Sequence, residues 1–181
     1  MVLLESLNLD LGSPAPDFEL PGIDGEIHNH NDFNQYKILC IVFMCNHCPY
    51  VQAVIDRLIK LQEEFKEEVR FIGINSNDAE NYPEDSFEKM PEYAKKWGLN
   101  FPYLRDESQE IAKEYKAQCT PDIFVYDEKR KLAYHGRVDD NWKDPEKVNK
   151  HELKNALKNL VSGKPAKDEQ KPSMGCSIKW K

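Results

Sequence analysis

The sequence is most constrained by two cysteines, Cys45 and Cys48, which are separated by two residues at an expected junction between a strand and a helix. Residues 38–43 are all apolar, as in a strand covered on both faces, and residues 51–65 carry apolar side chains at helical spacing. A helix that starts near Cys45 would direct unpaired N–H groups and its positive dipole end toward that sulfur, which favours the thiolate. Cys48 would lie one turn further on the same face. We therefore predict a redox-active cysteine pair in a thiol oxidoreductase.

The segments that follow the pair predict an α/β domain with a mixed sheet. Residues 69–75 form a second apolar run, so we expect a β-α-β unit with a right-handed crossover. Residues 122–127 and 131–135 predict a hairpin. If its first strand runs antiparallel to the strand before the cysteines, its second strand is parallel to that strand. Helices are also expected at residues 91–97, 108–116 and about 147–161.

The chain length predicts one main domain. A length of 181 residues suits a single domain with a sizeable core. We expect this domain at residues 1–162, followed by a polar C-terminal tail at residues 163–181. Asp24 and Gly25 form a turn signal between two short pieces near the N-terminus, which predicts a small hairpin.

The composition argues against several classes of function. The 25 basic and 32 acidic residues give a net charge of −7, which argues against nucleic acid as the main partner. No apolar run approaches the roughly 18 residues that span a membrane, and Glu5 stands where a secretory signal needs a basic start and a longer apolar stretch. We expect a cytoplasmic protein with no cofactor and no membrane partner. Because cytoplasmic thiols are kept reduced, a close cysteine pair there is catalytic or metal-binding rather than structural.

Several short motifs resemble a known family. They are residues 15–20, the turn at Asp24 and Gly25, residues 43–50 with the cysteine pair, Thr120 with Pro121, and residues 175–180. They resemble the thioredoxin fold and, more closely, redoxins of the alkyl hydroperoxide reductase/thiol-specific antioxidant superfamily, in particular a peroxiredoxin-like group. The resemblance implies a central mixed β-sheet flanked by helices, with an N-terminal β-hairpin extension. It also implies that Pro121 is a cis proline beside the cysteine pair, in a loop that holds a substrate peptide.

These positions predict thiol-disulfide exchange through a mixed disulfide. Cys45, as the more exposed sulfur, attacks the substrate, which is a disulfide-bonded protein or a small thiol compound, and Cys48 then attacks Cys45 to release the product. His47 can carry a positive charge that favours the Cys45 thiolate, which makes the pair less reducing than thioredoxin. The alternative for His47 is a solvated residue at the start of a helix. An unidentified thiol serves as the electron donor.

Three further residues are candidates for supporting roles. Cys119 lies two residues before Pro121 and either takes part in exchange or fills a tight loop. Cys176 is a candidate resolving cysteine, because the chain after residue 161 extends by up to roughly 3.3 Å per residue and can return to the site. Arg137 is expected at the site edge, where it stabilises a thiolate, binds an anionic substrate group or forms an ordinary ion pair.

The main alternative is a peroxiredoxin-like thiol peroxidase with an antioxidant role. That chemistry needs the pattern Pro-x-x-x-Thr-x-x-Cys, but Ile41 and Cys45 stand at the Pro and Thr positions counted back from Cys48. Ile38 and Val42 stand there when the count starts from Cys45. Both departures argue against direct peroxide chemistry.

Two readings involve no catalysis at the pair. One is a thioredoxin-fold binding module that holds a partner strand without turnover. The other is a zinc site, which we do not predict, because the strong signal is two CxxC pairs and this chain has one pair with single cysteines elsewhere.

Overall fold

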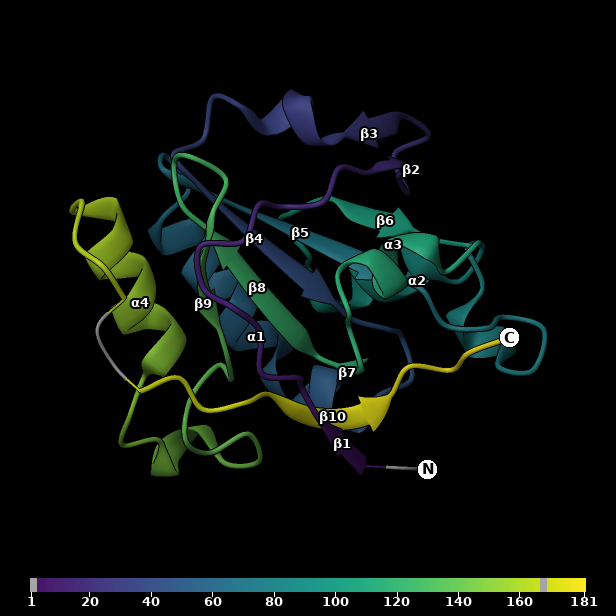
Figure 1. Ribbon diagram of the computed structural model, residues 1–181. Helices are drawn as coiled ribbons and strands as arrows, with labels where there is room; N and C mark the ends of the chain where they lie inside the picture. Colours follow the sequence, from purple (N-terminus) through teal and green to yellow (C-terminus); the bar gives the residue numbers. More distant parts are fainter. Residues whose placement is uncertain (1–2, 167–168) are drawn as a thin grey trace.

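The structure is a computed structural model that describes residues 3–166 and 169–181. Its centre is a five-stranded sheet in the order β6-β5-β4-β8-β9 (Figure 1). Strand β4 is parallel to β5, and β5 is parallel to β6, whereas β8 is antiparallel to both β4 and β9. The predicted mixed sheet and hairpin are therefore confirmed. The strands are β4 (Ile38–Phe43), β5 (Val69–Asn75), β6 (Tyr103–Arg105), β8 (Asp122–Tyr126) and β9 (Leu132–His135).

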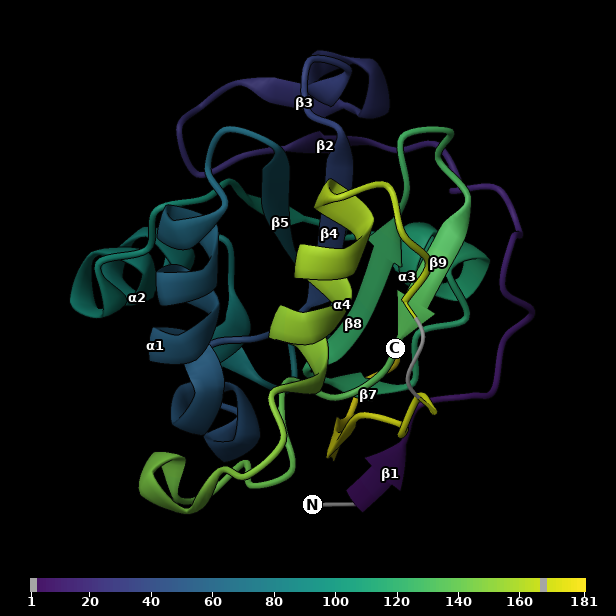
Figure 2. The ribbon, with the colours of Figure 1, turned by 90° about the vertical axis from the view of Figure 1, so that its left-hand side faces the viewer.

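Helices and a hairpin cover the two faces of this sheet (Figure 2). Helices α1 (Pro49–Glu64), α2 (Met90–Trp97) and α4 (Glu152–Val161) pack on one face. The short helix α3 (Glu110–Glu114) lies near the other face, which is also covered by the N-terminal hairpin of β2 (Glu19–Pro21) and β3 (Ile27–Asn29). Across the described residues, no helix combines the length and the apolar character that crossing a membrane requires.

Strand β4 explains why the sequence before the cysteines is an unbroken apolar run. All six of its residues are buried, because its neighbours lie on both sides and layers cover both faces. Alternate side chains enter different halves of the core, with Cys40 and Val42 toward α1 and α4 and Ile41 and Phe43 toward the N-terminal hairpin. The strand therefore holds the loop that follows it in a fixed place.

Three helices begin later than predicted, and one of them is α3, which begins at Glu110 rather than at residue 108. Helix α1 begins at Pro49, after both cysteines, because a proline in the first turn needs no N–H partner. Helix α4 begins at Glu152 rather than near residue 147. A 3₁₀ turn, η3 (Pro145–Lys147), comes before it. The residues between this turn and α4 are held to Asp140, which accepts a hydrogen bond from the N–H of Asn149 at 2.9 Å and donates its own N–H to the Lys150 carbonyl at 3.1 Å.

A second, three-stranded sheet was not predicted. It consists of β1 (Leu3–Glu5), β10 (Met174–Ser177) and β7 (Cys119–Thr120), all antiparallel, with β10 in the middle (Figure 1). Strand β10 comes from the tail that follows α4, and it lies between the N-terminus and the residues next to Pro121. The two ends of the chain are thus joined beside the cysteine pair.

Candidate active site

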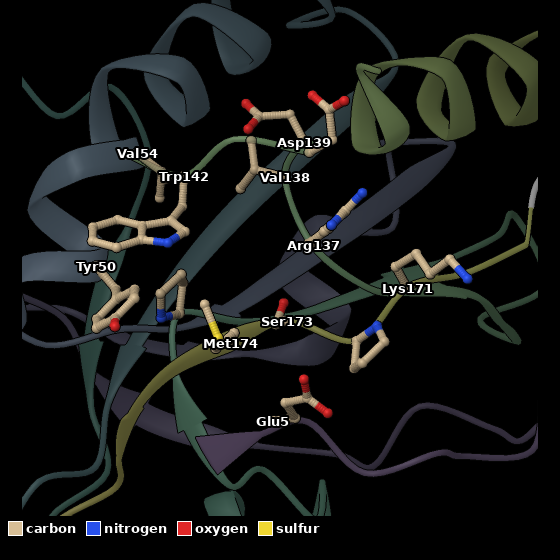
Figure 3. A pocket seen from close by; sticks show the side chains of 13 residues that line it. Glu5, Tyr50, Val54, Arg137, Val138, Asp139, Trp142, Lys171, Ser173 and Met174 are labelled. Carbon is tan, nitrogen blue, oxygen red and sulfur yellow. The ribbon is translucent and has the colours of Figure 1, made fainter. Parts of the chain in front are cut away.

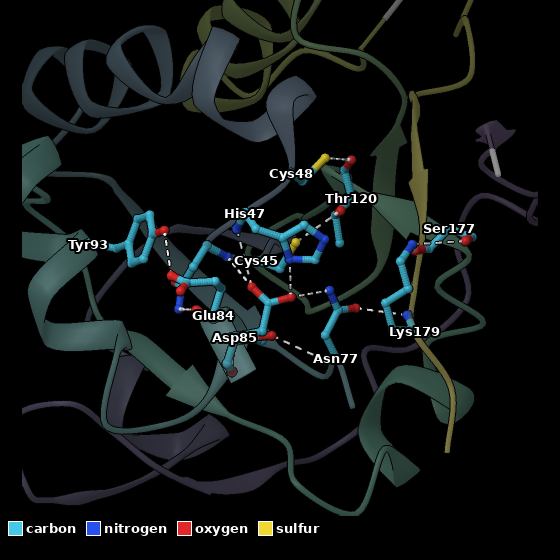
Figure 4. Close-up of polar contacts among 12 residues, drawn as sticks. Cys45, His47, Cys48, Asn77, Glu84, Asp85, Tyr93, Thr120, Ser177 and Lys179 are labelled. Atoms are coloured by element: carbon cyan, nitrogen blue, oxygen red, sulfur yellow. Dashed lines mark hydrogen bonds and ion pairs between the residues drawn. The ribbon is translucent and has the colours of Figure 1, made fainter. Parts of the chain in front are cut away.

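Cys45 and Cys48 lie in the connection between β4 and α1 (Figure 4). Met44 anchors this connection by donating its N–H to the carbonyl oxygen of Ile74 in β5, at 2.9 Å. Cys48 is the N-cap of α1, so the helix dipole acts at Cys48 and not, as the sequence suggested, at Cys45. The residue exposures are 1% for Cys45 and 0% for Cys48, so exposure does not identify Cys45 as the attacking sulfur.

Thr120 in β7 contacts both sulfurs. Its Oγ1 lies 3.5 Å from the Sγ of Cys45, and its carbonyl oxygen accepts a hydrogen bond from the Cys48 thiol at 3.1 Å. The bond between Thr120 and Pro121 is cis, as the resemblance implies. All five cysteines are reduced, so the structure shows the dithiol state of the pair.

The two thiols differ in acidity. A hydrogen bond with Cys45 lowers the pKa of Cys48 to about 5, helped by Thr120 and by the N–H of Val51 in the first turn of α1, while burial opposes the change. Burial raises the pKa of Cys45 well above its ordinary value, and the negative charge of Asp85 adds to this increase. Cys48 is therefore the thiol that ionises first, and Cys45 keeps its proton and shares it with the Cys48 thiolate.

His47 lies between the two cysteines and forms an ion pair with Asp85, with its Nδ1 2.6 Å from Oδ2. Asp85 is fully buried and accepts further hydrogen bonds from the N–H of Asn46 at 2.8 Å and from Nδ2 of Asn77 at 2.7 Å. The hydrogen bond with Asp85 raises the pKa of His47. Burial acts to raise the pKa of Asp85, but the bonds with His47 and Asn77 hold it below its ordinary value. The charge of His47 is thus balanced by Asp85, and this geometry does not favour the expected stabilisation of the Cys45 thiolate by His47.

Asp85 is the site residue that sequence reasoning missed. It ends the 3₁₀ turn η2 (Pro83–Asp85), inside a segment that reads as a polar loop. Its backbone is held by Asn75, whose Nδ2 donates to the Asp85 carbonyl at 3.0 Å, and Asn46 reaches the neighbouring Glu84 carbonyl at 2.8 Å. Pro83 signals a turn there, but no spacing in the sequence connects Asp85 with the cysteines.

The tail brings a third thiol to the pair. Cys176 in β10 lies opposite Thr120 in the strand register and is 2% exposed. Its thiol and that of Cys48 are hydrogen-bonded. Burial, followed by this bond, raises the pKa of Cys176 to about 12. The candidate resolving cysteine therefore lies at the site, and its resolving role stays a prediction.

Cys119 and Arg137 lie at the margin of the site. The Sγ of Cys119 is buried 3.7 Å from the Pro121 carbonyl oxygen, and burial raises its pKa. Successive strand residues point to opposite faces, so the side chains of Cys119 and Thr120 diverge. This favours the alternative in which Cys119 fills a tight loop over the one in which it takes part in exchange. Arg137 donates from Nε and Nη2 to Oε1 of Glu152, at 3.0 and 2.6 Å, and so forms the ordinary ion pair.

Comparison with known proteins identifies the family. Residues 11–135 match the AhpC/TSA family, which is more than half of the chain. The chain belongs to the AhpC/TSA family. The thiol-disulfide oxidoreductase ResA of Geobacillus thermodenitrificans is 24% identical over 130 residues, which are 71% of this chain and 70% of that protein. Peroxiredoxin Bcp of Escherichia coli K12 is 30% identical over 108 residues, which are 59% and 64% of the two chains.

Solved structures confirm the fold of this AhpC/TSA protein. An uncharacterized conserved protein from Geobacillus kaustophilus is 43% identical with a TM-score of 0.94, covering 100% of this chain and 97% of its own. A hypothetical protein from Sinorhizobium meliloti 1021 is 37% identical with a TM-score of 0.93, covering 98% of each chain. The thioredoxin domain of a thiol-disulfide oxidoreductase from Bacteroides vulgatus is 17% identical with a TM-score of 0.61, covering 71% and 89%, and it shows the thioredoxin-like fold alone.

Cys45, His47 and Asp85 of this AhpC/TSA protein are also placed where they could hold a metal ion. One ligand atom from each lies within 4.8 Å of the other two. The His47 ring and the Asp85 carboxylate are already paired with each other, however, so a metal would have to replace that ion pair. The expectation of a site without a metal stays a prediction.

A pocket of about 230 Å³ opens beside Pro121 (Figure 3). Its walls include Tyr50 and Trp142, whose ring centroids are 4.2 Å apart, together with Arg137 and residues 171–174 of the tail. The pocket lies next to the loop that carries Thr120, and its aromatic walls could hold an apolar part of a bound polypeptide.

Proposed function

We propose that this AhpC/TSA protein is a thiol-disulfide oxidoreductase whose redox pair is Cys45 and Cys48. The observation that carries the proposal is the shared environment of the two sulfurs. Both contact Thr120, they are hydrogen-bonded to each other, and only one of them is acidic. A dithiol that holds one thiolate and one proton donor in contact can exchange disulfides at neutral pH.

The position of Cys48 at the N-cap of α1, where the helix dipole favours a thiolate, supports the opposite order of attack from the one that the sequence suggests. The Cys48 thiolate attacks one sulfur of a substrate disulfide, a bond forms between them, and the other substrate sulfur leaves as a thiolate. Cys45 then attacks the Sγ of Cys48, which closes the disulfide between Cys45 and Cys48 and releases the second substrate sulfur. Two electrons pass from the pair to the substrate, and a thiol donor must return them.

His47, in its neutral form, is the proton acceptor for the second step. Cys45 has to lose its proton to attack, and one ring nitrogen of His47 lies within 4.8 Å of its sulfur. The Cys48 thiolate, which holds the Cys45 proton in the dithiol state, is consumed once the mixed disulfide forms. Cys45 therefore becomes more acidic at the moment when it must attack.

The test is a titration of thiols over time. The reduced protein is mixed separately with a disulfide-bonded reporter protein such as insulin and with hydrogen peroxide. We expect the thiols of Cys45 and Cys48 to be lost to the protein disulfide and to react slowly with peroxide. Loss to peroxide alone would show a peroxidase, and loss to neither would leave a binding module.

The acidity of Cys48 gives a separate prediction. We expect the ultraviolet absorbance of its thiolate to appear as the pH rises through about 5, because Cys45 and the helix N-terminus stabilise the anion. The measurement is the absorbance difference between the wild type and Cys48→Ser across a pH series. A midpoint near the ordinary cysteine value of about 8.5 would contradict the predicted stabilisation.

A thiol peroxidase is the second candidate. It is favoured by the acidic Cys48 at a helix N-terminus and by the relative named peroxiredoxin Bcp. Against it, Cys45 replaces the threonine and Ile41 replaces the proline of the peroxide-binding pattern. The peroxide arm of the titration decides between the two functions.

A further inference from the structure

The C-terminal strand β10 occupies the sheet edge next to Pro121. Its Cys176 is opposite Thr120 and its Ser177 is opposite Cys119, in an antiparallel ladder. Extended peptides commonly bind to proteins by adding a strand to such an edge. In this protein the edge is filled by the protein's own tail, which Figure 1 shows passing beside β7.

Gly175 shows how closely this strand fits. A Cβ atom added to Gly175 would lie 2.0 Å from the Thr120 carbonyl oxygen and 2.6 Å from the Thr120 carbonyl carbon. These are backbone atoms, so they cannot move aside as a flexible side chain could. The residue before Cys176 must therefore be glycine for β10 to pack at this distance from Thr120.

The tail is held at both ends of β10. Before the strand, the Ser173 N–H donates to Oγ of Ser6, and Oγ of Ser173 donates to the Gly136 carbonyl, both at 2.9 Å. After the strand, the Lys179 N–H donates to Oδ1 of Asn77 at 2.9 Å. Asn77 also donates to Asp85, so the end of the tail is connected to the polar network under the cysteine pair (Figure 4).

We infer that β10 is a tethered substrate strand and that its Cys176 is a third redox thiol, which takes over the disulfide from Cys45 by bonding to Cys48. The inference rests on the proposed function and deepens it. It follows from three observations: the register with Thr120, the close fit at Gly175 and the contact between the thiols of Cys176 and Cys48.

The exchange balances within the chain. After deprotonation, the Cys176 sulfur attacks the Cys48 sulfur of the disulfide between Cys45 and Cys48. The bond between Cys48 and Cys176 forms, the bond between Cys45 and Cys48 breaks, and Cys45 leaves as a thiolate that takes up the proton lost by Cys176. No outside oxidant is needed, and tethering keeps Cys176 at a high effective concentration.

Disulfide mapping tests the inference. The reduced protein is treated with one equivalent of diamide, which accepts two electrons and two protons from two thiols. Exchange is then stopped with acid, the remaining thiols are alkylated, and peptides are mapped by mass spectrometry. We expect disulfides between Cys45 and Cys48 and between Cys48 and Cys176. In Cys45→Ser, only the second should remain.

The variant Gly175→Ala separates the position of the strand from its thiol. It retains every cysteine but pushes β10 away from Thr120, so the share of the disulfide between Cys48 and Cys176 should fall by at least about tenfold. The matched control is Ser177→Ala, in the same strand, which keeps the backbone ladder and should leave the share unchanged.

The outcomes distinguish this inference from the proposed function. The inference would be overturned by two results together: the wild type forms only the disulfide between Cys45 and Cys48, and Cys45→Ser forms no disulfide with Cys176. These results would leave the proposed function intact. In Cys176→Ser the disulfide between Cys45 and Cys48 should form, and its absence there would contradict the proposed pair together with the transfer from Cys45. If the share of the disulfide between Cys48 and Cys176 were equal in Gly175→Ala and the wild type, the position of β10 would not control the reaction of Cys176.

Discussion

The substitution Cys48→Ser is expected to lower the rate of exchange with a protein disulfide by at least about a thousandfold. Cys48 is the thiol that ionises near pH 5, and a serine hydroxyl in its place stays protonated. Cys45 cannot replace it, because burial raises the Cys45 pKa well above its ordinary value. The measurement is the initial rate of thiol release from a reporter protein such as insulin, with the reduced form of this protein in excess.

The companion variant Cys45→Ser should behave differently. Its Cys48 can still attack, and when Cys176→Ser is added to remove the other thiol in contact with Cys48, a mixed disulfide between Cys48 and the substrate should accumulate and be visible by mass spectrometry. Cys40→Ala is the control, because Cys40 is a buried thiol in β4 whose pKa is raised by burial, and its loss should leave the rate unchanged. If Cys48→Ser formed the mixed disulfide and the double variant Cys45→Ser/Cys176→Ser did not, Cys45 would be the attacking sulfur.

Most of the main sheet could be predicted because its signals are local. Residues 38–43 and 69–75 are apolar runs, and Asp24 with Gly25 marks the turn of the N-terminal hairpin. The start of α1 was misplaced by a few residues, because apolar spacing defines a helix face and not its first residue. Pro49 could have settled the point, since proline favours the first turn of a helix. As a result, the sequence analysis assigned the effect of the helix dipole to Cys45 and not to Cys48.

The remaining parts of the site depend on contacts between distant segments. Residues 174–180 do alternate, with apolar Met174, Cys176, Ile178 and Trp180, but Gly175 lies inside this run and a run this short does not identify a strand's partners. Strand β10 forms because both sides are paired, with β1 from the N-terminus and β7 next to Pro121. Asp85 reaches the site in the same way, through hydrogen bonds with Asn46 and Asn77. Local sequence spacing does not identify the partner segments in either arrangement.

The substitution Asp85→Asn is expected to lower the free energy of unfolding by about 3 kcal/mol near pH 5.5, because removal of one partner leaves the other charge of a buried pair uncompensated. The side chain of Asp85 is fully buried, and that of His47 is 24% exposed. The asparagine amide would also place a donor against Nδ2 of Asn77, which now donates to Asp85.

The loss of unfolding free energy in Asp85→Asn should depend on pH. The pKa of Asp85 is below its ordinary 3.8, so its contribution is complete above that value and is lost as the pH falls through the folded pKa. The pKa of His47 is above its ordinary 6.5, so its contribution is complete below that value and is lost as the pH rises through the folded pKa. The difference between wild type and variant should therefore be largest between these two values and smaller on either side.

Urea unfolding of the reduced proteins, followed by circular dichroism at several pH values, measures this difference. Glu84→Gln is the matched control, because Glu84 precedes Asp85 in the same turn but is exposed, and its stability change should stay within about 0.5 kcal/mol. A loss for Asp85→Asn that is the same at every pH would mean that packing, and not the ion pair with His47, stabilises this loop. A pH-dependent loss with its maximum in the expected window would show that the pair holds the loop that carries Cys45 and Cys48.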